Sequence, residues 1–383
     1  MNDQLKVYAP FDRTLIGTLP MADADELEQK IATAHDLFQD RSQWIPAHKR
    51  IAILEKARAL MEDKIEDLTN TAAQEGGKPY QDSMVEVKRA INGLKIATEE
   101  ISHMKGGQIP MGITESSVNR LAFTIREPIG VVASLSAFNH PLNLIVHQVI
   151  TAFAAGCPVI VKPASKTPYS CMALVEILKE AGVPEGWVQS IHCSNELSEK
   201  LVGDTRINFL SFIGSAKVGW SLKSKMAPGT RCALEHGGAA PVIVEKDSVF
   251  EEMLPLLVKG GFYHAGQVCV SVQKVFAHNS IAEKLANDIA NEAKKLKVGN
   301  PLSEDTEVGP LIETGEVDRV DEWVKEAISG GAKLLCGGKK ISDTCYEPTV
   351  LLNPSNEAKI SQQEVFGPVV CVYAYEDREE AIA

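Results

Sequence analysis

Ile129-Gly130-Val131-Val132-Ala133-Ser134-Leu135 is an almost entirely apolar stretch, and such a run is typical of a parallel strand that is covered on both faces. Apolar residues at helical spacing follow over residues 144–155, and Gly156-Cys157-Pro158 ends that helix. A second apolar run, Val159-Ile160-Val161, comes next. The order of strand, helix and strand predicts a parallel α/β unit.

The same alternation extends on both sides of this stretch. The chain before it is helical in pattern, with a break at Gly76-Gly77-Lys78-Pro79, and a second α/β unit begins near Ala239. Between the helices and the first strand, residues 118–125 read as a strand that pairs with residues 112–114 in a hairpin. We therefore expect a doubly wound α/β fold. Helices are expected at residues 23–71, 82–103, 169–181, 197–202, 281–296, 317–329 and 377–383. Further strands are expected at residues 188–191, 207–212, 241–244 and 333–335.

The composition is that of a globular protein. Of 383 residues, 44% are hydrophobic and 23% are charged, and the formal net charge is −12. An acidic chain without a basic stripe disfavours nucleic-acid binding. No secretory signal opens the chain, and no apolar run approaches the roughly 18 residues that cross a membrane. We expect a cytoplasmic protein that binds neither nucleic acid nor membrane.

The eight cysteines show no disulfide framework in so long a chain, so we expect reduced thiols. No Cys-x-x-Cys pair occurs, and His140 and His147 on one helix face lack further ligands nearby. A metal site is therefore not expected.

Cys269 and Glu235 form the most informative pair of polar residues. Cys269 lies in Gly266-Gln267-Val268-Cys269-Val270, and Glu235 begins Glu235-His236-Gly237-Gly238. A thiol beside small residues can gain thiolate character from backbone N–H groups, and a separate carboxylate can activate water to release a covalent intermediate. Taken singly, a cysteine is more often a buried apolar residue, and the pair alone leaves that interpretation open.

A doubly wound sheet suggests a nucleotide, although no Gly-x-Gly-x-x-Gly follows any expected strand. Gly214 and Ser215 follow a strand, with Gly219 further along, and could offer N–H groups and a hydroxyl to a pyrophosphate. Lys162 ends another strand, where ligands collect in such sheets. An ordinary strand-to-helix turn and a solvated lysine are the alternatives.

Seven blocks of sequence, in this order and spacing, resemble the aldehyde dehydrogenase superfamily. They are Pro128-Ile129-Gly130-Val131, Phe138-Asn139-His140-Pro141, Ala155-Gly156-Cys157-Pro158-Val159-Ile160-Val161-Lys162-Pro163-Ala164, Phe212-Ile213-Gly214-Ser215, Glu235-His236-Gly237-Gly238, Gly266-Gln267-Val268-Cys269 and Glu364-Val365-Phe366-Gly367-Pro368.

The resemblance implies an aldehyde-dehydrogenase-like α/β fold with three parts. Residues 1–112 and 127–238 would form a doubly wound cofactor-binding domain, residues 113–126 a small β-hairpin for oligomerisation, and residues 239–383 an α/β catalytic domain. Family members usually continue beyond the point where this sequence stops, so we expect the catalytic domain to be incomplete at its C-terminus. A homo-oligomer is expected for the full-length family form.

The resemblance also implies the chemistry. Cys269 would attack an aldehyde carbonyl, the thiohemiacetal would give hydride to NAD(P)+, and water would hydrolyse the thioester to a carboxylic acid. Glu235 would be the base. Asn139 would stabilise the oxyanion together with the backbone N–H of Cys269.

On the cofactor side, the family places Lys162 at the adenosine ribose and Gly214, Ser215 and Gly219 around the pyrophosphate. Glu364 and Phe366 would lie at the nicotinamide ribose and ring. Ser165, followed by Lys166, stands where NAD-selective members carry an acid. A hydroxyl and an ammonium tolerate a 2′-phosphate, so the expected cofactor is NADP or NAD, with NADP or dual use favoured.

The aldehyde itself is not specified. The family pattern places His140, Leu144 and His147 at the substrate entry and Val268 and Val270 beside the nucleophile. Partly cationic histidines would favour acidic or phosphorylated aldehydes, but this is the less favoured interpretation, because Val268 stands where phosphate-binding members carry an Arg. By general likeness, a semialdehyde that carries a carboxylate is the first expectation and a hydroxyaldehyde is the next. The other functions considered are a CoA-acylating relative, a catalytically silent structural or interaction protein, and a cysteine hydrolase.

Overall fold

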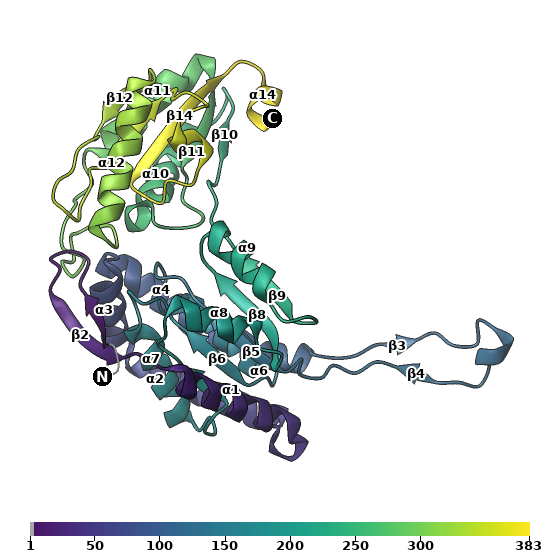
Figure 1. Cartoon of the computed structure of the whole chain (residues 1–383). Coiled ribbons are helices and arrows are strands. Elements are labelled where there is room, and N and C mark those ends of the chain that lie inside the picture. Colours follow the sequence, from purple (N-terminus) through teal and green to yellow (C-terminus); the bar gives the residue numbers. More distant parts are fainter. Residues whose placement is uncertain (1–3) are drawn as a thin grey trace.

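The computed structural model describes residues 4–383 and has two lobes and a long projecting hairpin (Figure 1). The first lobe contains a parallel sheet in the order β7-β6-β5-β8-β9. The chain adds strands outward from β5 on one side and then returns to add β8 and β9 on the other. The strand order therefore switches between β5 and β8, which is where ligands bind in such sheets. The strands are β5 (Val131–Leu135), β6 (Val159–Lys162), β7 (Val188–Ser190), β8 (Ile207–Ile213) and β9 (Arg231–Glu235).

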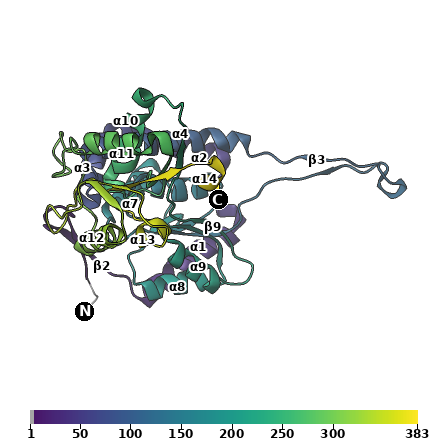
Figure 2. The same cartoon turned by 90° about the horizontal axis from the view of Figure 1, so that it is seen from above.

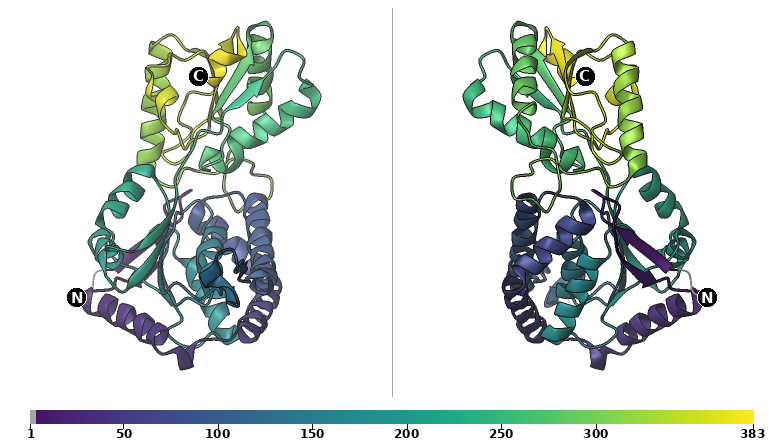
Figure 3. Two further views of the ribbon diagram at one scale, coloured as in Figure 1. Left: turned by 90° about the vertical axis from the view of Figure 1, so that its right-hand side faces the viewer. Right: turned by 90° about the vertical axis from the view of Figure 1, so that its left-hand side faces the viewer.

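Helices cover both faces of this sheet (Figure 3). Alternate residues of β5 divide between two cores: Val131 and Ala133 pack with α1 and α8, and Val132 packs with α2, α4 and α7. This explains why the stretch from residue 129 to 135 is apolar except for Ser134. The helices are α1 (Ala24–Gln39), α2 (Ala47–Asp63), α3 (Ile65–Gly76), α4 (Tyr80–His103), α7 (Tyr169–Ala181), α8 (Asn195–Gly203) and α9 (Ala216–Lys225).

The helix expected at residues 144–155 is confirmed, but it has a π-helical turn in its middle. It consists of α5 (Asn143–Ile145), the π segment η3 (Val146–Ile150) and α6 (Thr151–Ala154). Such turns are often found near functional sites.

The second lobe is built on a sheet in the order β10-β11-β14-β13-β12, parallel except for β12. The sequence analysis did not find β11, β13 or β14, although β14 is the central strand and is buried along most of its length. The elements are β10 (Val242–Val244), α10 (Phe250–Phe262), β11 (Lys274–His278), α11 (Asn279–Ala293), α12 (Thr314–Ser329), β12 (Lys333–Cys336), β13 (Thr349–Leu352), α13 (Lys359–Gln362), β14 (Val369–Tyr375) and α14 (Arg378–Ile382).

The projecting hairpin pairs β3 (Gln108–Ile109) with β4 (Ala122–Phe123) and extends away from both lobes (Figures 1 and 2). The expected pairing with residues 112–114 is wrong, because Gly112 has a φ of 80° and the chain then forms the 3-10 turn η2 (Glu115–Ser117). The first paired strand thus precedes the predicted range 113–126. The division into domains and the oligomerisation role of the hairpin stay predictions.

A second hairpin pairs β1 (Gln4–Tyr8) with β2 (Leu15–Pro20), and the sequence analysis did not predict it. Its turn contacts the second lobe, where the Thr344 hydroxyl donates to the Phe11 carbonyl at 2.8 Å. Among residues 4–383, no helix is both long and apolar enough to cross a membrane.

Candidate active site

Four of the predicted site residues lie at or just beyond the carboxyl ends of the strands in the first lobe. Asn139 follows β5, Lys162 ends β6, Gly214 follows β8 and Glu235 ends β9. The Gly214 N–H donates to the Glu235 carbonyl at 3.0 Å, so these two motifs are in direct contact. The sheet topology therefore brings residues from four separate sequence blocks to one edge.

Cys269 is exposed on a loop that follows α10 and the 3-10 turn η4 (Tyr263–Gly266). His264 and Ala265 in this turn have left-handed φ values of 49° and 53°, a conformation that costs about 1–3 kcal/mol in a residue with a side chain. A Cβ on Gly266 would lie 2.0 Å from the Gly367 carbonyl oxygen. The nucleophile loop is thus held in a strained path against residues 366–368.

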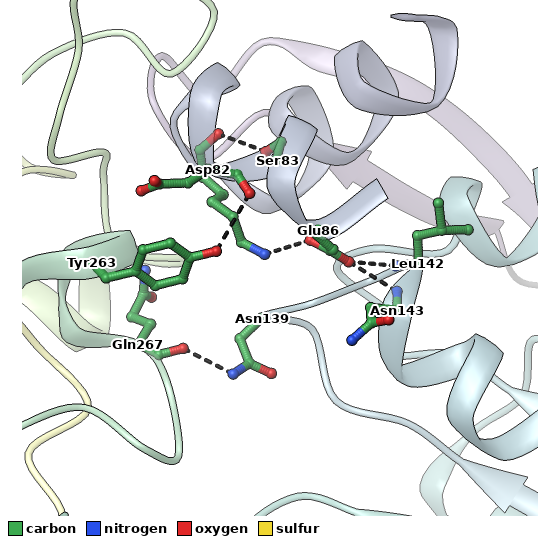
Figure 4. A network of polar contacts seen from close by, with 9 residues as sticks. Asp82, Ser83, Glu86, Asn139, Leu142, Asn143, Tyr263 and Gln267 are labelled. Carbon is green, nitrogen blue, oxygen red and sulfur yellow. Dashed lines mark hydrogen bonds and ion pairs between the residues drawn. The ribbon is translucent and has the colours of Figure 1, made fainter. Parts of the chain in front are cut away.

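Gln267 anchors this loop, and the sequence analysis did not assign it a role. Its side-chain amide donates to the His264 and Pro310 carbonyls, at 3.3 and 3.2 Å, and its Oε1 accepts from the Ile312 N–H at 2.9 Å. The Gln267 carbonyl accepts from Asn139 Nδ2 at 2.9 Å (Figure 4). This hydrogen bond uses one N–H of the Asn139 side-chain amide and holds the amide against the carbonyl of Gln267, two residues before Cys269. The second N–H of the amide remains available to another acceptor.

A buried ion pair supports Asn139 from α4. Lys78 and Glu86 pair with both side chains fully buried. The other carboxylate oxygen of Glu86 accepts from the backbone N–H groups of Leu142 and Asn143, at 2.9 and 3.0 Å (Figure 4). The sequence analysis treated Lys78 only as part of a turn.

A second carboxylate approaches Cys269 besides Glu235. Glu364 Oε1 accepts from the Gly238 N–H at 3.1 Å, and a Cβ on Gly238 would lie 3.0 Å from the Cys269 carbonyl oxygen. Burial raises the pKa of the Cys269 thiol, and the negative charges of Glu364 and then Glu235 raise it further. Burial also raises the pKa of Glu364. Cys269 is therefore a protonated thiol at neutral pH, so attack requires a base.

The cofactor side contains an open helix N-terminus. Ser215 caps α9, with its hydroxyl accepting from the Val218 N–H at 3.5 Å, and Ser215 and the first turn of α9 are exposed. Such a turn, with Lys217 in it, suits a pyrophosphate. Burial lowers the pKa of Lys162 at the neighbouring strand end. The donor set fits a dinucleotide.

Gly219 is buried within the packing of the α9 helix. A Cβ at this position would lie 2.2 Å from Nε2 of His236. The His236 ring packs edge-on to Phe212 and Trp220. His236 is therefore a packing residue, and Gly219 provides the space for its ring. A direct contact of Gly219 with cofactor stays a prediction.

On the substrate side, His140 stacks on Tyr263 with ring centroids 6.1 Å apart. Burial and nearby positive charges hold the pKa of His140 well below its usual value. This direction speaks against a partly cationic His140, the interpretation that the sequence had already disfavoured. His147 and Val270 are exposed, Leu144 is half-buried and Val268 is buried. Within the described range 4–383, no group of three potential metal ligands occurs.

Comparisons with known proteins decide the family. The model of the aldehyde dehydrogenase family matches residues 1–383. The chain belongs to the aldehyde dehydrogenase family. It is 36% identical over 382 residues to 3-sulfolactaldehyde dehydrogenase from Priestia aryabhattai, covering 100% of this chain and 79% of that protein.

Two solved structures are similar over nearly the whole chain. Aldehyde dehydrogenase 21 from Physcomitrella patens, in complex with the reaction product succinate, has a TM-score of 0.95 and 34% identity, covering 100% of this chain and 79% of that one. Glyceraldehyde-3-phosphate dehydrogenase from Methanocaldococcus jannaschii, complexed with NADP, has a TM-score of 0.93 and 35% identity, covering 99% and 82%.

As a member of the aldehyde dehydrogenase family, the protein is an oxidoreductase that oxidises an aldehyde with NAD or NADP. The expected aldehyde-dehydrogenase-like α/β fold is confirmed. The roles of individual residues are not tested by these comparisons.

Proposed function

We propose that the protein oxidises an aldehyde bearing an anionic group to the carboxylic acid, with Cys269 as nucleophile. The observation that carries this proposal is the 2.9 Å hydrogen bond from Asn139 to the Gln267 carbonyl. It joins the amide that follows β5 to the loop of Cys269, the only one of the eight cysteines that is exposed.

The first step is the activation of the thiol. Because the pKa of Cys269 is raised, Glu235 takes the thiol proton as the sulfur attacks the carbonyl carbon and a thiohemiacetal forms. The oxyanion accepts from the second N–H of Asn139 and from the backbone N–H of Cys269. Losing one such donor typically raises the barrier by about 2.7–4 kcal/mol.

When bound, the nicotinamide cofactor accepts the hydride from the thiohemiacetal carbon and leaves a thioester on Cys269. After Glu235 has passed the thiol proton to solvent, it removes a proton from water, which attacks the thioester carbon and releases the acid and the Cys269 thiolate. Glu364 is the alternative base, because its carboxylate also influences the Cys269 thiol.

The cofactor would lie along the strand ends of the first lobe. Lys162 and Ser165 would contact the adenosine ribose, and Gly214 and Ser215 the pyrophosphate. Glu364 and Phe366 would lie at the nicotinamide end. Phe366 has a φ of 46° and packs edge-on to Phe138 at 5.8 Å, so this ring is held beside the strand end that carries Asn139.

Two relatives support an anionic substrate. One is named for 3-sulfolactaldehyde and the other was solved with succinate. Both compounds carry an acidic group in addition to the oxidised carbon. The preferred substrate class is an aldehyde with a carboxylate at its far end.

We also propose a homo-oligomer formed through the projecting hairpin, and a cytoplasmic location. The hairpin exposes large apolar side chains that a second copy of the chain would cover. These are Ile109, Ile113, Val118, Leu121, Phe123 and Ile125.

The decisive experiment measures reduced nicotinamide formed per mole of chain with a panel of aldehydes and NAD or NADP. Many equivalents support the hydrolytic cycle. Cys269→Ala should abolish reduction. Glu235→Gln should slow both the initial burst and the turnover, because Glu235 acts in thiol attack and in hydrolysis, with Glu364→Gln as the comparison. A burst lost in Glu364→Gln but kept with full turnover in Glu235→Gln would reassign the base.

A further inference from the structure

His264 is a buried polar residue of the nucleophile loop to which the proposed mechanism gives no role. It lies in the 3-10 turn η4, before Cys269, and is fully buried. Its φ of 49° is left-handed, and a residue with a side chain keeps such a conformation only where its surroundings over-determine it. Phe262 and Ala265, on either side of it, belong to the core of the second lobe. The surroundings of the His264 ring are therefore the place to look for the reason.

The ring of His264 contacts the first lobe. It lies edge-on to the ring of His140, with the centroids 6.4 Å apart. Burial, and then the positive charge of Lys78, hold the pKa of His264 well below its usual value, so the imidazole is neutral at physiological pH. Neither ring nitrogen has a hydrogen-bond partner among residues 4–383. The ring therefore acts on the first lobe through its shape and packing.

Two consecutive residues of the nucleophile loop restrict the His140 ring. It stacks on Tyr263, with centroids 6.1 Å apart and planes inclined by 18°, and it meets His264 at 81°. Tyr263 is itself fixed, because its hydroxyl donates to the Asp82 carbonyl at 3.3 Å (Figure 4). The His140 ring is thus held by one stacked contact and one edge-on contact.

His140 directly follows Asn139, which lies against the same loop. The Asn139 amide donates to the Gln267 carbonyl at 2.9 Å. Gln267 in turn donates to the His264 carbonyl from its backbone N–H, at 3.1 Å, and from its side-chain amide, at 3.3 Å. A single N–H···O contact lets the Asn139 amide pivot about the Gln267 carbonyl. The ring contacts at the next residue remove that freedom.

We infer that His264 is a positioning residue, which acts through His140 to hold the second N–H of Asn139 toward the oxyanion that forms on Cys269. This inference rests on the proposed function, which gives Asn139 the oxyanion. Without the His264 ring, the hydrogen bond of Asn139 would remain, but its amide would be placed less precisely. A misplacement of about 1 Å can cost on the order of 100-fold in rate.

The test compares two reactions of the same thiol, and neither needs cofactor or turnover. With p-nitrophenyl acetate, the sulfur of Cys269 attacks the ester carbon, an oxyanion forms, nitrophenolate leaves and an acetyl thioester remains. Iodoacetamide alkylates the same sulfur by displacement of iodide and forms no oxyanion. In both reactions the thiol proton goes to Glu235 or solvent. The ratio of the two rates therefore reports the oxyanion donors and cancels the pKa and the exposure of the thiol.

His264→Gly should lower the acylation-to-alkylation ratio by about 10-fold, as a partial loss of one oxyanion donor. Glycine tolerates the left-handed φ, so this variant removes the ring and keeps the path of the backbone. His264→Phe keeps a ring of similar shape and should stay within about threefold of the wild type. His278→Gly is the matched control, because His278 also lies edge-on to an aromatic ring of the second lobe, that of Tyr375. It should leave the ratio unchanged.

A double-mutant cycle separates positioning from a general loosening of the fold. In an Asn139→Ala background, His264→Gly should change the ratio by less than about twofold, because the amide that it positions is gone. The same loss with and without Asn139, or equal slowing of acylation and alkylation, would overturn the inference. A loss in His264→Phe as large as in His264→Gly would also overturn it. If Asn139→Ala alone left the ratio unchanged, the proposed role of Asn139 would fail, and the inference with it.

Discussion

Lys166, which follows β6 on the cofactor side of the first lobe, forms an ion pair with Glu313, the residue that precedes α12 in the second lobe. The two side chains are 49% and 42% exposed. Lys166 was the cation expected beside Ser165 to tolerate a 2′-phosphate. The residues next to Ser165 in sequence include no acid, but the fold brings the Glu313 carboxylate of the second lobe to Lys166 beside it.

We predict that Glu313→Gln strengthens the binding of a 2′-phosphate, because Lys166 is released and a negative charge is removed. For an exposed pair the change is about two- to fivefold. Titration calorimetry with 2′,5′-ADP and 5′-AMP measures it without turnover. Asp318→Asn, an exposed acid on α12 that pairs with Lys340, is the control. The same 2′,5′-ADP to 5′-AMP ratio in all three proteins would show that Glu313 does not act on this site.

The second prediction concerns the thiol. The pKa of Cys269 lies above its usual value of 9.0, with Glu364 contributing more than Glu235. Alkylation by iodoacetamide should therefore rise steadily with pH across the neutral range. Glu364→Gln should speed alkylation at pH 7 more than Glu235→Gln does, because each removes a charge that opposes the thiolate. Mass spectrometry of the Cys269 peptide gives the rates. Slower alkylation in Glu364→Gln would mean that this carboxylate activates the thiol.

The third prediction concerns the buried pair Lys78 and Glu86. Glu86→Gln leaves a buried ammonium without its partner and should lower the free energy of unfolding by about 3–5 kcal/mol. Urea unfolding measures the loss. Lys95→Gln, which breaks the exposed pair with Glu99 on the same helix, should change stability by less than about 1 kcal/mol. If Glu86→Gln and Lys95→Gln lowered the free energy of unfolding by similar amounts, burial would not be the reason that the Lys78–Glu86 pair matters for stability.

The fourth prediction concerns pH. Glu75 accepts from the N–H groups of Tyr169 and Ser170 at the start of α7, and burial raises its pKa to about 7. Because the folded pKa exceeds the usual 4.5, this carboxyl stabilises the fold at low pH. That contribution is lost as pH rises through about 7.

Glu75→Gln cannot titrate, so its stability relative to the wild type should improve between pH 5 and pH 8, by on the order of 3 kcal/mol. Denaturant unfolding at several pH values gives the difference. Glu66→Gln, an exposed position on the same helix α3, should follow the wild type. A constant difference at all pH values would show that Glu75 titrates normally in the fold.

The sequence alone predicted four of the five strands of the first lobe, because most of them are short apolar runs between helices of regular period. The edge strand β9 (Arg231–Glu235) was missed, since it is a short run with a charged residue at each end. Residues 129–135 and 159–161 proved to be the strands β5 and β6, and α7 has the predicted bounds of residues 169 and 181. The ordered motifs also predicted the family. The second lobe was predicted less completely, because β11, β13 and β14 were missed. The pattern of β14 was nevertheless present, since Val369–Tyr375 is a continuous apolar run.

Only the tertiary structure decided which charges meet. Lys166 and Glu313 are 147 residues apart, and Asn139 reaches Gln267 across 128 residues. Local periodicity reports which face of a helix or strand is apolar, whereas the pairing of polar groups depends on how distant segments are brought together. For the same reason the burial of Lys78 could not be predicted from its neighbours in sequence, because it depends on Glu86 and on the segments packed around this pair.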